Sequence, residues 1–184
     1  DLKLSRGLGD VYKRQRNKEE TILLKEPTNG KYGQKLWEML SGNIEATTEE
    51  ILELFVLDRK EHVNQKIKPA LDDGKIVLMD RYYYSTMAYQ AAAGIDVNRI
   101  RRDNEFAPKP DIVLIFDLPA DLAMKRVRSH SVADVFEKEE HLEKVRKAYL
   151  NLEDDSLVRI IDATRTPEVI FDEVWRLVSE VRNG

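Results

Sequence analysis

Apolar residues gather in four short runs along the chain, with longer segments of helical periodicity between them. The runs span Thr21–Leu24, Lys75–Met79, Asp111–Phe116 and Val158–Ile161. Such runs of β-branched residues and leucine are typical of strands that are buried on both faces of a parallel sheet. Three of them are followed directly by an acid, namely Asp80, Asp117 and Asp162.

Helical spacing of apolar residues marks the segments between the runs. We expect helices over Gly33–Leu40, Thr47–Asp73, Ala120–Arg128, Phe136–Leu152 and Pro167–Val181, and a further helix after Asp80. Thr47 and Glu50 form a capping-box pattern at the start of the longest helix, and Gly74 follows its end. Thr166 before Pro167 is typical of an N-cap with proline in the first turn.

Strands that alternate with helices predict the α/β class, with βαβ units, right-handed crossovers and a parallel sheet that carries helices on both faces. Ligands of such sheets bind beyond the carboxyl ends of the strands. The residues that directly follow the runs are therefore the first candidates for a functional site: Lys25 to Pro27, Asp80 and Arg81, Asp117, and Asp162 to Thr164.

The composition narrows the class of protein without indicating a function. The 184 residues suffice for one domain with a sizeable core, and 42% hydrophobic residues argue against disorder. A net charge of −4 gives no support for a nucleic-acid partner. The chain has no cysteine, which excludes a disulfide scaffold, a thiolate metal site and a cysteine nucleophile. Since no apolar run approaches the roughly 18 residues of a membrane span, we expect a cytoplasmic protein without a membrane partner.

The strongest local signal is the segment KIVLMDRYYYS, in which a predicted strand delivers Asp80 and Arg81 to the carboxyl edge of the sheet. A carboxylate there can hold Mg²⁺ through water, because Mg²⁺ prefers oxygen ligands and keeps much of its hydration. The adjacent guanidinium can bind a phosphate with two hydrogen bonds. Together they indicate phosphoryl transfer. The alternative is that Asp80 caps the next helix and Arg81 makes a surface ion pair.

Phe55 and Arg59 are four residues apart on the longest predicted helix and therefore share a face. An aromatic ring and a guanidinium on one face could stack on a base and bind its edge or its phosphate. By themselves they fit equally a core phenylalanine and a solvated arginine. The three histidines, His62, His130 and His141, show no metal-ligand spacing and are expected at the surface.

Two further segments carry weaker signals. Ser85, Tyr89 and Gln90 supply a hydroxyl, a ring and an amide within the helix expected after Asp80, although ordinary helix-face polarity also explains them. Residues 124–140 run from a basic helix end, with Arg126 and Arg128, through a small polar segment into an acidic helix. A lid over a polyphosphate has this pattern, and so does a solvated loop between helices.

Taken in order, six segments resemble the thymidylate kinase family of P-loop nucleoside-monophosphate kinases. They are EPTNGKYGQKL, LFVLDRKEHV, DRYYYSTMAYQ, PKPDIVLIFDLP, KRVRSHSVADVFE and IDAT. The resemblance covers about Thr21 to Val181 and implies a three-layer P-loop NTPase-type parallel sheet with helices on both faces. It also implies Mg²⁺- and ATP-dependent phosphorylation of dTMP to dTDP in dTTP biosynthesis. The family works as a homodimer, with the helix around Leu54–Ile67 near the interface.

The resemblance implies roles for the residues that match the family's acceptor motifs, and it sets aside the ordinary readings of Phe55, Arg59, Asp80 and Arg81. Asp80 would lie near Mg²⁺, through water, and Arg81 would clamp the dTMP phosphate and the transferring group. Phe55 would stack on thymine, and Arg59 would contact the base edge or the phosphate end. The residues implied to line the acceptor pocket are Ser85, Tyr89, Gln90 and, in the KEP segment, Glu26.

The resemblance also implies where the donor ATP binds. Arg126 would pack on adenine at the root of a lid near residues 128–137, and Arg128 would lie at the lid's entrance. Asp162, Ala163 and Thr164 would flank the adenine. Arg126 and Arg128 are thereby counted with Asp80 and Arg81 as implied catalytic residues.

Two features depart from the family's pattern. The family begins with a central strand and a P-loop of the type G-x-D-G-x-G-K-T, and neither precedes Thr21. Residues 1–16 stand there as a basic leader, which we interpret as non-native sequence before a single domain at 17–184. In the lid, His130 and Val135 occupy positions where related bacterial lids carry arginine, and neither side chain neutralises transferring charge as a guanidinium does.

Without the P-loop, the donor site lacks its main receptor for the β- and γ-phosphates. The sequence therefore predicts a thymidylate kinase whose activity is impaired in this chain. Two alternatives stay open. One is a kinase for another nucleoside monophosphate or a deoxynucleoside, and the other is a nucleotide-binding module without catalysis.

Overall fold

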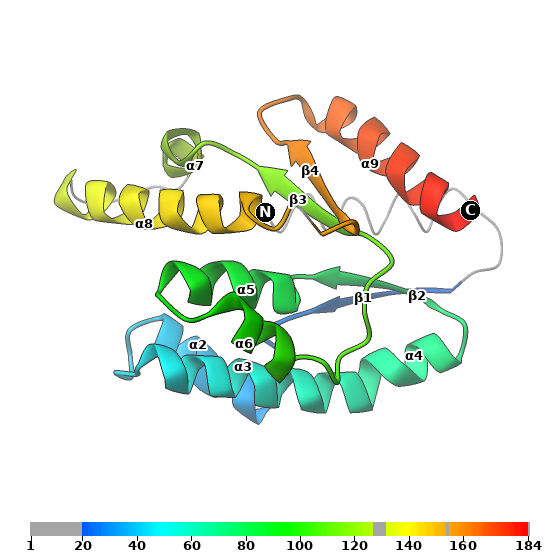
Figure 1. Ribbon diagram of the computed structural model, residues 1–184, viewed down its shortest axis with the longest axis horizontal. Coiled ribbons are helices and arrows are strands. Elements are labelled where there is room, and N and C mark those ends of the chain that lie inside the picture. The colour runs from blue at the N-terminus through cyan, green and yellow to red at the C-terminus, as the bar shows by residue number, and fades with distance from the viewer. Residues whose placement is uncertain (1–19, 127–131, 154, 184) are drawn as a thin grey trace. The chain divides into compact units, whose positions relative to one another are not determined.

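Helices and strands alternate along the chain, as the hydrophobic pattern predicts (Figure 1). The computed structural model describes residues 20–126, 132–153 and 155–183, of which 124–126, 132–139 and 183 are described by their backbone alone. Within these residues the protein is mixed α/β with parallel strands, which confirms the predicted class. The expected leader at residues 1–16 lies outside the described residues.

The four apolar runs form the four strands of the described residues. These are β1 (Thr21–Lys25), β2 (Ile76–Asp80), β3 (Val113–Asp117) and β4 (Val158–Asp162). β1 pairs with β2 and β3 pairs with β4, both in parallel. The pairing produces two two-stranded sheets rather than one continuous ladder.

The chain folds into two compact units, each with one of these sheets. Of the described residues, those up to Thr86 and Ile95–Pro108 form the first unit, and Met87–Gly94 and those from Lys109 onward form the second. Helix α5 (Tyr83–Ala92) begins in the first unit and ends in the second.

The strands are less buried than the apolar runs predict. No residue of β1 or β2 is fully buried, and Leu23 and Phe116 are 41% and 40% exposed. The described residues of β1 and β2 are therefore mostly half-buried rather than fully buried.

The first unit builds its core from helices around β1 and β2. The helices are α2 (Lys31–Leu40), α3 (Thr48–His62), the π-helical turn η1 (Val63–Ile67), α4 (Lys68–Asp72) and α6 (Val97–Asp103). α2 packs against α3, and α4 contacts β2. Leu36, Leu52, Val63 and Ile100 are buried between these elements.

The long helix predicted over Thr47–Asp73 is helical throughout but contains a π turn. In η1 the N–H of Lys68 donates to the carbonyl of Val63, five residues back. Pro69 follows at once, and it has no N–H for the carbonyl of Gln65 and its ring would collide with a regular α-helical turn. The wider turn accommodates this proline.

The ends of this helix behave as the sequence predicts. The Thr47 side chain accepts from the N–H of Glu50, while the Glu50 carboxylate accepts from the N–H of Thr47, which completes the capping box. Gly74 follows the helix with φ of +71°. The short helix α6 was not predicted. Its signal was Asp96, whose side chain accepts from the N–H of Asn98.

The second unit contains three further helices of the described chain. They are α7 (Ala120–Arg126), α8 (Val132–Leu150) and α9 (Pro167–Asn183). α7 contacts α8, and α9 contacts β4 (Figure 1). α8 begins before the predicted Phe136, so the end of the expected lid segment is helical, while residues 127–131 lie outside the description. No described helix is both long and apolar enough to cross a bilayer.

Candidate active site

The register of β1 and β2 brings two of the predicted segments to one edge of the first sheet. Lys25 pairs with Asp80, and the N–H of Glu26 donates to the carbonyl of Asp80 at 3.2 Å. The segment after β1 therefore starts directly beside Asp80 and Arg81. This convergence at the carboxyl ends is what parallel strands predict.

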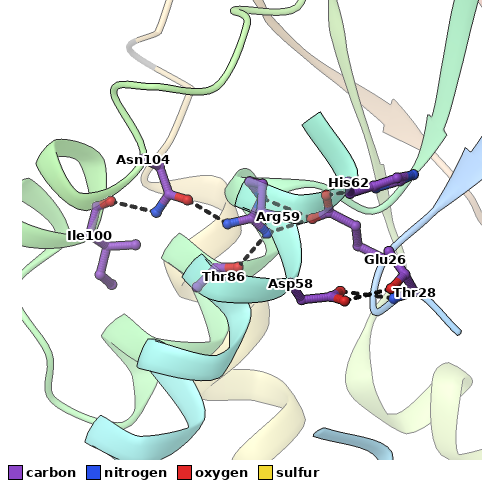
Figure 2. A network of polar contacts seen from close by, with 8 residues as sticks. All are labelled: Glu26, Thr28, Asp58, Arg59, His62, Thr86, Ile100 and Asn104. Atoms are coloured by element: carbon purple, nitrogen blue, oxygen red, sulfur yellow. Dashed lines mark hydrogen bonds and ion pairs between the residues drawn. The ribbon is translucent and has the colours of Figure 1, made fainter. Parts of the chain in front are cut away.

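Arg59 of α3 lies at the centre of a buried polar network at this edge (Figure 2). Its side chain is fully buried, and its Nε donates to Oε2 of Glu26 at 2.8 Å. The guanidinium also donates from Nη1 to Asn104 at 2.5 Å and from Nη2 to the hydroxyl of Thr86 at 3.1 Å. Arg59 is therefore held in one plane by partners from three different elements.

Two more residues of α3 reach the same loop after β1. The ring Nδ1 of His62 lies 3.1 Å from Oε1 of Glu26. The Asp58 carboxylate accepts from the backbone N–H of Thr28 at 2.8 Å and from its hydroxyl at 2.5 Å. We call Glu26, Thr28, Asp58, Arg59, His62, Thr86 and Asn104 the Arg59 network.

The loop that the Arg59 network holds is also packed tightly against α2. A Cβ atom at Gly33 would lie 2.0 Å from the carbonyl oxygen of Thr28. Only glycine fits at this close approach of two backbones. The loop is thus fixed from two sides, by α3 through polar contacts and by α2 through shape.

Tyr82, at the start of the YYY sequence, covers the Arg59 guanidinium. The guanidinium carbon lies 5.3 Å from the centre of the Tyr82 ring, which is a cation–π distance. The Tyr82 hydroxyl is buried and has no hydrogen-bond partner in the described part of the chain. Burial, reinforced by the charge of Glu26, raises the pKa of Tyr82 well above its usual range. A buried hydroxyl of this kind is suited to a polar atom of a ligand or to a water molecule.

Asp80 and Arg81 differ in what they contact. The Asp80 carboxylate is half-buried and makes no hydrogen bond or ion pair with a described residue, so it does not cap α5. Arg81 is exposed and has φ of +66°, a left-handed conformation that is rare for residues other than glycine. Strained backbone of this kind clusters at ligand sites.

The chemistry of these residues fits a magnesium ion. The described residues contain no cluster of three or more acidic, histidine or cysteine side chains that could enclose a metal. Mg²⁺ does not need one, because it commonly uses one or two carboxylates and keeps several waters. The uncommitted carboxylate of Asp80 meets that requirement.

The other predicted acceptor residues of the first unit are Phe55 and Ser85. Phe55 is half-buried one turn before Arg59 on α3, and Ser85 is half-buried on α5 beside Thr86. Arg59 itself is buried, which rules out its reading as a solvated surface charge. Among the predicted site residues, the structure joins Glu26 and Arg59 by direct contact.

Tyr89 and Gln90 belong to the second unit. The Tyr89 ring lies 6.2 Å from the ring of Tyr149 and 6.5 Å from that of His141, both on α8. Gln90 is 5% exposed, and its Oε1 has no hydrogen-bond partner among the described residues. A buried amide oxygen without a partner fits a residue that binds a ligand.

Asp162, Ala163 and Thr164 form a turn at the end of β4. Oδ1 of Asp162 accepts from the hydroxyl of Thr164 at 2.6 Å and from its N–H at 2.9 Å. These bonds lower the pKa of Asp162. The N–H of Ala163 donates to the carbonyl of Asp117 at 2.8 Å. The Asp162 carboxylate therefore closes its own turn, so a ligand here would meet the shape of the turn more than a free charge.

The remaining predictions fall partly outside the described residues. Arg126 ends α7 but its side chain is not described, and Arg128 and His130 lie in the segment 127–131. The expectation that His62 is a surface residue is wrong, because it is 7% exposed and contacts Glu26. His141 is exposed, as expected.

Sequence reasoning missed five members of the Arg59 network: Thr28, Asp58, His62, Thr86 and Asn104. Two of them carried a signal, since Asp58 and His62 are four apart on the helix face next to Arg59. Asn104 carried none, because it meets Arg59 only through the packing of α6.

Comparisons with known proteins all match this chain to one family. The family model described as thymidylate kinase matches residues 7–174. A probable thymidylate kinase of Archaeoglobus fulgidus is 41% identical over 162 residues, which cover 88% of this chain and 81% of that protein. A thymidylate kinase of Desulfotalea psychrophila is 48% identical over 129 residues, covering 69% and 64%. One of Xylella fastidiosa (strain M12) is 38% identical over 163 residues, covering 88% and 74%.

Proposed function

This chain belongs to the thymidylate kinase family, and on that premise we propose that it binds dTMP beside the Arg59 network and carries the acceptor half of an ATP-dependent dTMP kinase. One observation supports this placement most directly. The paired ends of β1 and β2 set an uncommitted carboxylate, Asp80, and an exposed guanidinium, Arg81, beside the buried pair of Glu26 and Arg59.

The first unit supplies the acceptor residues in this proposal. Arg81 binds the dTMP phosphate, Phe55 stacks on thymine, and Ser85 lines the pocket. A guanidinium has five N–H donors, and hydrogen bonds to Glu26, Thr86 and Asn104 account for three of those on Arg59. In this proposal a remaining N–H of Arg59 meets the edge of the base. Glu26 fixes Arg59 in the orientation that presents it.

The second unit supplies the remaining residues. Tyr89 and Gln90 are the nucleoside-binding residues of this unit in the proposal, and the Oε1 of Gln90, which has no partner among the described residues, supports that role. On the donor side, Arg126 packs on adenine, Arg128 serves the lid, and the turn Asp162, Ala163 and Thr164 flanks the adenine.

The proposed reaction does not require the protein to supply a strong proton acceptor. The attacking oxygen belongs to the dTMP phosphate, which is already ionised at neutral pH, so no strong general base is needed. Positioning and neutralisation of charge supply most of the catalysis in phosphoryl transfer. Arg81 neutralises charge on the acceptor side. A Mg²⁺ held through water by Asp80 would screen the charge of the phosphate oxygens.

We also propose that the chain as written binds dTMP but holds ATP weakly. Its sequence contains no G-x-x-x-x-G-K-S/T segment, whose backbone N–H groups and lysine bind the β- and γ-phosphates. Turnover should then be low. The experiment is a calorimetric titration with dTMP, dUMP, dCMP, dGMP and ATP in turn, beside an assay of phosphate transfer.

A marked preference for dTMP supports the proposal, and equal or tighter binding of dGMP or dCMP favours a kinase for another monophosphate. Binding of dTMP without any turnover favours the alternative of a binding module. Arg81→Ala should weaken dTMP binding at least about tenfold. The matched control is Arg99→Ala, which removes an exposed ion pair with Glu49 on the same unit.

We further propose a homodimer that uses the α3 side of the first unit. An open groove of about 660 Å³ lies there, with Leu52, Val56, Leu57 and Phe106 in its lining. Charges of both signs, including Glu53 and Lys60, also line it, which suits a surface that pairs with itself. Sedimentation of the wild type and of Leu57→Glu tests this, since the variant should be monomeric. The cytoplasmic location stays a prediction.

A further inference from the structure

Glu26 is held through both of its carboxylate oxygens. Oε2 lies 2.8 Å from Nε and 2.7 Å from Nη2 of Arg59, so one oxygen serves two guanidinium nitrogens. Oε1 faces Nδ1 of His62 at 3.1 Å (Figure 2). The carboxylate is 2% exposed and so has almost no access to solvent. Among the described residues, His62 is therefore the hydrogen-bond partner of the second carboxylate oxygen, Oε1.

The contact also defines where the proton of the His62 ring sits. An ionised carboxylate can only accept hydrogen bonds, so Nδ1 must carry the hydrogen and donate it to Oε1.

The orientation of the carboxylate depends on this donor. With Oε1 fixed by His62, Oε2 stays between Nε and Nη2 of Arg59. Without His62 the carboxylate can rotate about its last bond, and the guanidinium loses the restraint on that side. Asn104 accepts from Nη1 and Thr86 accepts from Nη2, so Glu26 alone holds Nε. A buried oxygen left without a donor is also costly by itself.

We propose that His62 is a positioning residue for acceptor binding: it orients Glu26, and through Glu26 it holds Arg59 in the plane in which it meets the nucleotide. The proposal rests on the proposed function in taking Arg59 as a residue of the dTMP site. His62 itself touches no ligand. Its position one turn after Asp58 lets a single helix turn hold the whole loop after β1.

The test uses a matched pair of substitutions. His62→Asn keeps a side-chain N–H close to the position of Nδ1, whereas His62→Leu keeps apolar volume and removes the donor. We expect His62→Leu to raise the Kd for dTMP about tenfold, and His62→Asn to stay within about threefold of the wild type. Thermal unfolding is measured for both variants. A general loss of structure would lower the stability and the dTMP affinity of His62→Asn and His62→Leu alike, whereas loss of the Nδ1 donor affects only His62→Leu.

A folded His62→Leu variant that binds dTMP as tightly as the wild type would overturn the proposal. If this variant does not fold, the protonation state of the His62 ring in the wild type tests the proposal instead. Its nitrogen-coupled proton NMR spectrum should show His62 protonated on Nδ1, with the signal assigned by its loss in His62→Asn among only three histidines. A ring protonated on Nε2 alone overturns the proposal. Failure of the wild type to bind dTMP contradicts the proposed function instead, because the ligand-free spectrum does not depend on it.

Discussion

Arg146 of α8 donates two hydrogen bonds to the carboxylate of Asp117, the last residue of β3. Nε donates to Oδ1 at 2.6 Å and Nη2 donates to Oδ2 at 2.9 Å. The two side chains are 29% and 21% exposed. The bonds to Asp117 raise the pKa of Arg146 above its usual range. The pair ties α8 to the carboxyl end of the second sheet, where the predicted donor residues follow β4.

Breaking this pair should destabilise the second unit measurably. Arg146→Met should lower the free energy of unfolding by about 1–2 kcal/mol, because two charge-assisted bonds at a half-buried site are lost. Arg176→Ala is the control, since its partner Glu180 lies one turn away on α9 and both are about 60% exposed. That loss should stay below about 0.5 kcal/mol. Urea unfolding measures both, and equal effects would contradict the difference in burial.

Removing the Arg59 guanidinium should be far more costly than removing an exposed one. Arg59→Leu leaves the Glu26 carboxylate buried without its charge partner and should lower the free energy of unfolding by about 3–5 kcal/mol. Adding Glu26→Gln should recover part of this loss, because the buried charge is then gone. Denaturant unfolding of the single and double variants tests the coupling. Purely additive effects would show that the two side chains do not depend on each other.

Gly33 should tolerate no side chain. In Gly33→Ala the new Cβ meets the backbone of Thr28, which cannot move aside as a flexible side chain would, so we expect a loss of about 2 kcal/mol or more. Gly74→Ala is the control, since its φ of +71° is strained but nothing lies within 4 Å. That variant should lose about 1 kcal/mol and keep its affinity for dTMP. Calorimetry should show weaker dTMP binding for Gly33→Ala alone.

The capping box predicts a pH dependence of stability at the start of α3. The backbone and hydroxyl bonds from Thr47 lower the pKa of Glu50 in the folded protein. A lowered folded pKa means that the stabilisation is complete above the unfolded value of about 4.3 and is lost as the pH falls through the folded value.

Glu50→Gln removes this titration while keeping an acceptor for Thr47. The loss of stability between about pH 5 and about pH 3 should therefore be smaller in Glu50→Gln than in the wild type. Urea unfolding at several pH values measures it, with the exposed Glu38→Gln as the comparison substitution. The same pH dependence in the wild type and in Glu50→Gln would contradict the assignment.

Local pattern was sufficient wherever the cause of a structure is local. The four apolar runs became β1 to β4, and Thr47 with Glu50 capped the long helix as predicted. These features depend on residues within one turn or one strand, whose spacing is visible in the sequence. The π turn before Pro69 also had a local cause, and the proline was its signal.

The motifs also predicted candidate site residues, some of which the structure brings together. The segments after the first two runs were expected to meet, and the register of Lys25 with Asp80 brings them together. Glu26 and Arg59 were both predicted as site residues from the resemblance. Their direct contact was not, because nothing in either segment encodes the other.

By itself, the sequence determined the family and the parallel α/β class, because periodicity and motif order are properties of neighbouring residues. Only the tertiary structure decided that Arg59 is buried, that His62 faces Glu26 and that Asn104 completes the network. The partners of Arg59 are 27, 33 and 45 residues away along the chain. A buried charge must find its partners wherever packing brings them, and no local pattern specifies contacts at that range.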